Sequence, residues 1–221
     1  MEIERIRSRA QVKRMNRLNN IPLYLDDDQI NNYSSYFKKG WKKLIKVLLF
    51  LERHPDVEGL NWLNQNRIEK SIECFNKCVK AFPRSWSSMW GLGKAYQIIG
   101  NHCASLEWFE KAYLLKQDLV DVALEASIEA MRIGNATKAL KYAESALALD
   151  RRNPDFHANH ALALLLNKQA EEAFVRAEKA LQLAPNSKRI QNINAYIRKI
   201  VFKTANYPMA IDPDSIYRGP Q

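Results

Sequence analysis

Cysteine and histidine side chains could hold a zinc ion, but their spacing in this chain does not assemble a site. Cys74 and Cys78 lie one helical turn apart, yet no histidine or second cysteine pair lies near enough to complete a zinc site. The chain also lacks the His-Glu-x-x-His motif of zinc hydrolases. We therefore expect no metal, and we expect both thiols to be buried and to pack as small hydrophobic groups.

The glycines and histidines do not indicate an active site either. Gly93 and Gly100 are separated along the chain, whereas a phosphate-binding loop would cluster its glycines. No Gly-x-Ser-x-Gly motif is present, and structural or solvent roles are favoured for His102, His157 and His160. The carboxylates are spread along the chain, which is typical of solvated helix surfaces. The sequence therefore predicts that the chain is not an enzyme, needs no cofactor and takes no small-molecule substrate.

The composition favours helices that pack into one domain or one array. The 221 residues include only 7 glycines and 8 prolines, and no run of eighteen apolar residues could span a membrane. The N-terminus lacks the apolar stretch of a secretory signal, and the three cysteines do not resemble a disulfide framework. These features predict a cytoplasmic protein.

Small side chains recur every 34 residues, which indicates an internal repeat. The columns of small residues are Gly59, Gly93, Ser127 and Ala161; Ser71, Ser105, Ala139 and Ala173; and Cys78, Ala112, Ala146 and Ala180. Small residues let two helices approach closely, and large residues between them fill the neighbouring spaces. Each unit is therefore interpreted as a helix, a turn and a second helix. Gly100 is expected at such a turn, because glycine readily adopts left-handed backbone.

The stretch WGLGKAYQIIGNHCASLEWFEKAY carries the residue pattern of a known repeat. The matching positions are Leu92, Gly93, Tyr96, Gly100, Phe109 and Ala112. Together with the 34-residue period, they resemble the tetratricopeptide repeat (TPR) family. The resemblance implies an all-α fold, namely a right-handed superhelical array of helix-turn-helix repeats. Its four units would span residues 52–85, 86–119, 120–153 and 154–185.

Segments outside the repeats are expected to flank this array. Residues 1–33 form a basic segment that is expected to be partly disordered or to contain a short helix, and an amphipathic helix is predicted for residues 34–51. Residues 186–204 carry an apolar stripe with polar residues around it, which predicts a helix that caps the end of the array. The tail, residues 205–221, contains several prolines and is expected to be extended.

The resemblance also implies where a partner would bind, because the first helices of such repeats line a concave groove. The predicted groove residues are Trp90, Lys94, Gln97, Ile98, Leu124, Ile128, Met131, Leu162 and Leu165. This set is more apolar than polar, so the predicted partner is another protein that contributes an extended peptide or an amphipathic helix. The predicted role is that of an adaptor, an assembly factor or a chaperone. One alternative stays open, in which the protein's own N-terminal segment or tail fills the groove.

Some family members bind the acidic C-termini of heat-shock chaperones with a clamp of basic and amide side chains. The corresponding positions in this chain are Asp56, Leu60, Gly91, Asp121 and Glu125. This departure from the family's pattern disfavours that ligand.

The net charge of +10 is concentrated near the N-terminus, where residues 1–50 hold eleven Lys and Arg against five Asp and Glu. The candidate contact residues in this segment are Arg5, Arg7, Arg9, Lys13, Arg14 and Arg17. They support an alternative function of a different class. In that alternative, the basic residues bind an acidic protein, a nucleic acid or an acidic membrane surface, and the repeats serve as a platform.

Overall fold

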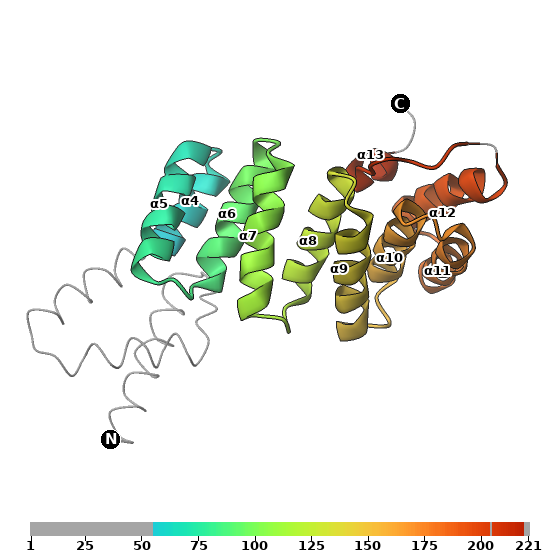
Figure 1. Cartoon of the computed structure of the whole chain (residues 1–221), viewed down its shortest axis with the longest axis horizontal. Helices are drawn as coiled ribbons and strands as arrows, with labels where there is room; N and C mark the ends of the chain where they lie inside the picture. Colours follow the sequence, from blue (N-terminus) through green and yellow to red (C-terminus); the bar gives the residue numbers. More distant parts are fainter. Residues whose placement is uncertain (1–54, 204, 219–221) are drawn as a thin grey trace, which may run out of the picture. The chain divides into compact units, whose positions relative to one another are not determined.

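The computed structural model describes residues 55–203 and 205–218, which belong to the second of two compact units, residues 54–221. The described part is helical and contains no strand. Its helices are α4 (Pro55–Asn64), α5 (Ile68–Ala81), α6 (Trp86–Ile98), α7 (His102–Leu115), α8 (Val120–Arg132), α9 (Ala136–Leu149), α10 (Pro154–Leu166), α11 (Ala170–Leu183), α12 (Lys188–Val201) and α13 (Pro213–Arg218). Consecutive helices from α4 to α12 pack against each other, as Figure 1 shows. The predicted helical array is confirmed.

The 34-residue period sets where the helices begin. Helices α6, α8, α10 and α12 start at residues 86, 120, 154 and 188, and α5, α7, α9 and α11 start at residues 68, 102, 136 and 170. Several of these starts are capped by a side chain that accepts a hydrogen bond from a free backbone N–H of the first turn. Asn101 accepts from the N–H of Ala104 at 3.1 Å, and Asn135 accepts from the N–H of Lys138 at 3.1 Å. The helix caps therefore repeat with the same 34-residue period as the small residues that pack the helices together.

The turns between paired helices share one backbone conformation. Gly100 and Gly134 have φ angles of 76° and 75°, and the equivalent residues Asn66 and Lys168 also have positive φ, at 57° and 63°. Lysine is an unusual residue in this region of backbone space. The turn geometry at Lys168 is therefore imposed by the two helices that it joins.

Small residues bring the paired helices into close contact. A Cβ atom on Gly93 would lie 2.5 Å from Cε1 of Phe109, a ring that is fully buried. The hydroxyl of Ser105 donates a hydrogen bond to the carbonyl oxygen of Gly93 at 2.9 Å, so the two helices are also joined by a polar contact. The alternation of small and aromatic residues thus fixes the distance between α6 and α7.

Helix α10 lies in the interior of the array. Residues 156–166 are all buried, because α10 packs against α8, α9, α11 and α12. Leu162 and Leu165 are fully buried in this core, which corrects their prediction as groove residues. An apolar side chain on such a helix faces a neighbouring helix in every direction, so the sequence pattern alone cannot assign it to an open surface.

The C-terminal part of the array is closed by α12 and by the tail. Ile190, Ile193, Ile197 and Ile200 of α12 are buried against the core. The tail, expected to be extended throughout, instead contains the short helix α13, which packs against α12 and α8. The Asp212 carboxylate accepts from the backbone N–H of Asp214, and the Ser215 hydroxyl donates to the Asp212 carbonyl, which explains why a helical turn starts at Pro213. The segments predicted for residues 1–33 and 34–51 lie outside the described residues.

Candidate functional site

A pocket of about 720 Å³ lies between α6, α8 and the tail. Its lining residues are Lys94, Gln97, His102, Glu125, Ile128, Arg132, Ala210, Asp212 and Asp214. Seven of these side chains are charged, amide or imidazole groups, so the pocket is mainly polar, in contrast to the apolar groove that the sequence predicts. Three of the apolar side chains expected there, Met131, Leu162 and Leu165, are buried in the core instead.

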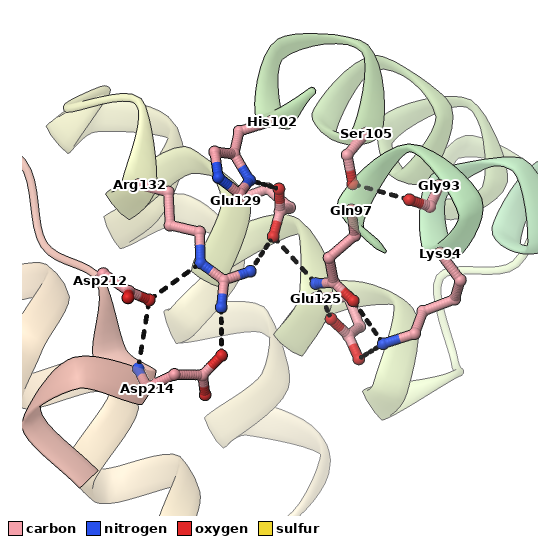
Figure 2. Close-up of polar contacts among 10 residues, drawn as sticks. All are labelled: Gly93, Lys94, Gln97, His102, Ser105, Glu125, Glu129, Arg132, Asp212 and Asp214. Atoms are coloured by element: carbon pink, nitrogen blue, oxygen red, sulfur yellow. Dashed lines mark hydrogen bonds and ion pairs between the residues drawn. The ribbon is translucent and has the colours of Figure 1, made fainter. Parts of the chain in front are cut away.

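A buried carboxylate organises one wall of the pocket. Glu129 on α8 has an exposed fraction of 0%, and three side chains surround its oxygen atoms. The Gln97 amide donates to Oε1 at 2.9 Å, Nδ1 of His102 lies 2.8 Å from Oε2, and Arg132 forms an ion pair with Oε1. Figure 2 shows these groups converging on Glu129 from α6, α7 and α8. A buried charge with this many partners is held in one orientation.

A second carboxylate links the same helices closer to the open side of the pocket. Glu125 accepts a hydrogen bond from the Gln97 amide at 2.8 Å, and its other oxygen atom lies 2.9 Å from Nζ of Lys94 (Figure 2). Gln97 thus joins Glu125 and Glu129, which are one helical turn apart on α8. This wall of the pocket is therefore a connected network of charged and amide side chains.

Arg132 connects this network to the tail. Its Nε lies 3.1 Å from Oδ1 of Asp212, and its Nη2 is paired with Asp214 (Figure 2). Burial opposes the charged form of Arg132, but the carboxylates of Asp212, Glu129 and Asp214 outweigh burial and raise its pKa. The guanidinium is therefore a permanent positive charge. It is held by Glu129 on its own helix and paired with the two carboxylates of the tail.

The structure divides the predicted groove residues into three groups. Lys94, Gln97 and Ile128 line the pocket together. Trp90 and Leu124 are half-buried and do not line it, and Ile98 is 51% exposed outside the lining.

The third group consists of core residues. Met131, Leu162 and Leu165 are fully buried and belong to one hydrophobic cluster, so they cannot form an open contact surface. The basic residues proposed as a second contact are outside the described residues; they are Arg5, Arg7, Arg9, Lys13, Arg14 and Arg17.

Sequence reasoning missed most of the charged residues of the pocket. His102, Glu129, Arg132, Asp212 and Asp214 were not predicted to act together, because charges on helices were interpreted as solvated faces. A signal was available on α8, where Glu125, Glu129 and Arg132 share one helix face at spacings of four and three. No comparable signal points to the aspartates of the tail.

Neither a metal-binding cluster nor a membrane-spanning helix occurs among the described residues. Among residues 55–203 and 205–218, no group of three or more His, Cys, Asp or Glu side chains is arranged to hold a metal ion. None of the described helices has the length and apolar character needed to cross a membrane.

Comparison with known proteins identifies the repeat. A family model described as tetratricopeptide repeat matches residues 58–118 and 124–188, which is more than half of the chain. The chain belongs to the TPR family. The TPR fold is typical of protein–protein interaction modules, whose function is generally not catalytic. No curated protein sequence matches the chain.

Solved structures agree with the TPR assignment. The protein MamA matches with a TM-score of 0.60 and 18% identity, over 72% of this chain and 82% of MamA. A MamA fragment from Desulfovibrio magneticus RS-1 has a TM-score of 0.63 and 14% identity, over 75% of this chain and 89% of the fragment. YrrB, described as a TPR protein with an unusual peptide-binding site, has a TM-score of 0.59 and 14% identity, over 72% of this chain and 80% of YrrB. At these identities, the similarity shows a shared fold.

Proposed function

We propose that this TPR protein is a non-enzymatic adaptor, assembly factor or chaperone that binds an extended peptide of a partner protein in the pocket between α6 and α8. One observation carries this proposal. A non-helical stretch of the tail, residues 205–212, already contacts this face, and the backbone N–H of Ile211 donates to the carbonyl oxygen of Met131 at 2.9 Å. The face can therefore hold a non-helical chain by main-chain and side-chain contacts, and space remains beside it.

The chemistry of the pocket supports a polar peptide rather than a purely apolar helix. Lys94, His102 and Arg132 supply donors, and Glu125 and Glu129 hold these donors in position. Ile128 adds an apolar contact at the floor. The peptide-binding site ascribed to YrrB, a protein of the same fold, is consistent with this proposal. The free thiols of Cys74 and Cys78 fit a reducing compartment such as the cytoplasm.

A cross-linking experiment in the native cell tests the proposal. The wild-type chain is compared with a pocket variant, Lys94→Ala/Ile128→Asp, and with a matched control, Lys111→Ala/Leu114→Asp, whose residues are exposed on α7 and do not line the pocket. Circular dichroism checks that all three chains fold. We expect a partner protein to be lost with the pocket variant and retained with the control. If both variants retain every partner, the pocket is not the binding site.

A further inference from the structure

The tail is attached to the array by a small set of specific contacts near Arg132. Ile211 is only 2% exposed and packs into the main hydrophobic cluster, while its N–H is bonded to Met131. A Cβ atom on Gly134 would lie 2.5 Å from the carbonyl oxygen of Met209, so the missing side chain at this turn makes room for the tail backbone. The buried Ile211 side chain, which anchors the tail, and the space left by Gly134 thus fix where the tail packs on the array.

Two carboxylates next to this anchor form ion pairs with a single guanidinium. Asp212 and Asp214 are two residues apart, and both pair with Arg132. The Arg132 side chain is largely buried, whereas the aspartate side chains are 51% and 49% exposed. Glu129 therefore holds Arg132 in place, whereas the two aspartates of the tail are half exposed to water. An ion pair to such an exposed carboxylate contributes little to stability, so the tail can exchange easily.

Between its anchors, the tail leaves part of the pocket uncovered. Met209 is 93% exposed, and the pocket stays open along Ala210, Asp212 and Asp214. A second anchor lies further along the tail, where the ring of Tyr217 stacks on Arg189 at 3.6 Å. The tail fills only part of the surface that the pocket offers, and the polar groups of Lys94 and Gln97 remain beside it.

We infer that the tail is a displaceable internal occupant of the binding site, and that the partner peptide carries the same pattern: an apolar residue followed by acidic residues at the first and third positions after it. Ile211, Asp212 and Asp214 provide this pattern in the tail. The inference rests on the proposed function and specifies its ligand. It requires an internal acidic pair beside an apolar residue and does not involve a C-terminal carboxylate. An occupied site lowers the apparent affinity for a partner by the fraction of molecules in which the site is free.

A peptide-binding measurement on the full chain tests this inference. The probe is a fluorescent peptide with the sequence of residues 205–218, and the control peptide has both aspartates replaced by asparagine. We compare the wild-type chain with the full-length variant Asp212→Asn/Asp214→Asn, in which the internal tail is weakened. We expect the variant to bind the probe at least about tenfold more tightly than the wild type, because more of its sites are free. Adding Arg132→Gln to the variant is expected to remove this gain, and the control peptide is expected to bind poorly to every chain.

Hydrogen exchange on the unmodified chain provides a second readout that does not depend on the stability of a variant. Excess unlabelled probe peptide should accelerate exchange of the Ile211 amide in the labelled chain and leave the Ile197 amide of α12 unchanged. The inference is overturned if the Ile211 amide is unaffected at millimolar peptide, or if the probe binds the wild type and the Asp212→Asn/Asp214→Asn variant equally well. If the cross-linked partner still depends on Lys94 and Ile128 in that case, only this inference fails. If the pocket variant retains every partner, the proposed function fails as well.

Discussion

The hydroxyl of Ser127 donates a hydrogen bond to the carbonyl oxygen of Ala139 at 3.0 Å, and this contact reverses the direction used in the two preceding units. There, Ser105 donates to the carbonyl oxygen of Gly93, and Ser71 donates to that of Gly59. In the third unit, the small residue and the hydroxyl have exchanged helices, and the polar link between the helices is kept. The repeat therefore preserves a contact rather than a residue type at each position.

The reversed bond of Ser127 should be worth more than its counterpart in the second unit. The amide of Asn159 also donates to the Ser127 hydroxyl, at 3.0 Å. The Asn159 side chain is buried, and its Oδ1 has no hydrogen-bond partner within the described part of the chain. Ser127→Ala would leave both ends of this amide without a partner. We expect Ser127→Ala to lower the free energy of unfolding by about 1–3 kcal/mol more than Ser105→Ala. Urea unfolding of both variants measures the difference, and equal midpoints would contradict it.

Gly93→Ala should destabilise the fold although alanine favours helices. Its Cβ would approach the buried ring of Phe109 to 2.5 Å, and overpacking of this kind costs about 1–3 kcal/mol. The double variant Gly93→Ala/Phe109→Leu should therefore lose less stability than the two single variants added together. Thermal unfolding of all three variants gives the comparison. Strict additivity would mean that the two residues do not compete for space.

Arg132→Met should be more damaging than Lys94→Met. Loss of Arg132 leaves the fully buried Glu129 without its cationic partner, and breaking such a pair costs about 3–5 kcal/mol. Lys94 pairs with Glu125, which is partly exposed, and loss of such a pair costs about 1 kcal/mol or less. The Asp212→Asn/Asp214→Asn variant controls for the loss of tail contacts. Denaturant unfolding should rank Arg132→Met well below both other variants; a similar stability for all three would contradict the role assigned to Glu129.

The stability of the protein should fall in mild acid because of His160. Burial, together with the smaller effects of the nearby Arg176 and His157, lowers the pKa of His160 to about 4. Neither ring nitrogen has a hydrogen-bond partner among the described residues. Between pH of about 6.5 and about 4, the unfolded chain binds a proton that the folded chain rejects, so the free energy of unfolding decreases as the pH falls.

The His160→Gln variant isolates this contribution. The slope of stability against pH in this window should be smaller for the variant than for the wild type, by at most about 1.4 kcal/mol per pH unit. Urea unfolding at a series of pH values measures both slopes. Identical slopes would show that His160 is not kept neutral by the fold.

The fold could be predicted from the sequence because its signals are local and periodic. The small side chain at Gly93 and the large one at Phe109 mark a close contact between adjacent helices, and this pairing of small and large residues recurs along the chain. Position 168 carries a lysine where the equivalent position 134 carries a glycine. Lys168 nevertheless adopts the same left-handed backbone as Gly134, because the packing of the two flanking helices outweighs the conformational preference of one residue.

The site was predicted only in part because its decisive contacts are not periodic. Lys94, Gln97 and Ile128 could be assigned from repeat geometry, but Leu162 could not be told apart from a core residue on a helix that is buried all round. The pairing of Arg132 with Asp214 joins distant parts of the chain, and no spacing rule connects them.

Gly134 and Gly100 occupy equivalent turns, but mutations at these positions would have different consequences. No atom of residues 55–203 and 205–218 lies within 4 Å of a Cβ atom placed on Gly100, whereas a Cβ atom on Gly134 meets the backbone of Met209. A substitution at residue 100 has to be accommodated in one turn, and a substitution at residue 134 has to be accommodated in the C-terminal segment as well. Over generations, the third turn and the end of the chain are therefore expected to change together, while the second turn is constrained by its own left-handed backbone and not by the tail.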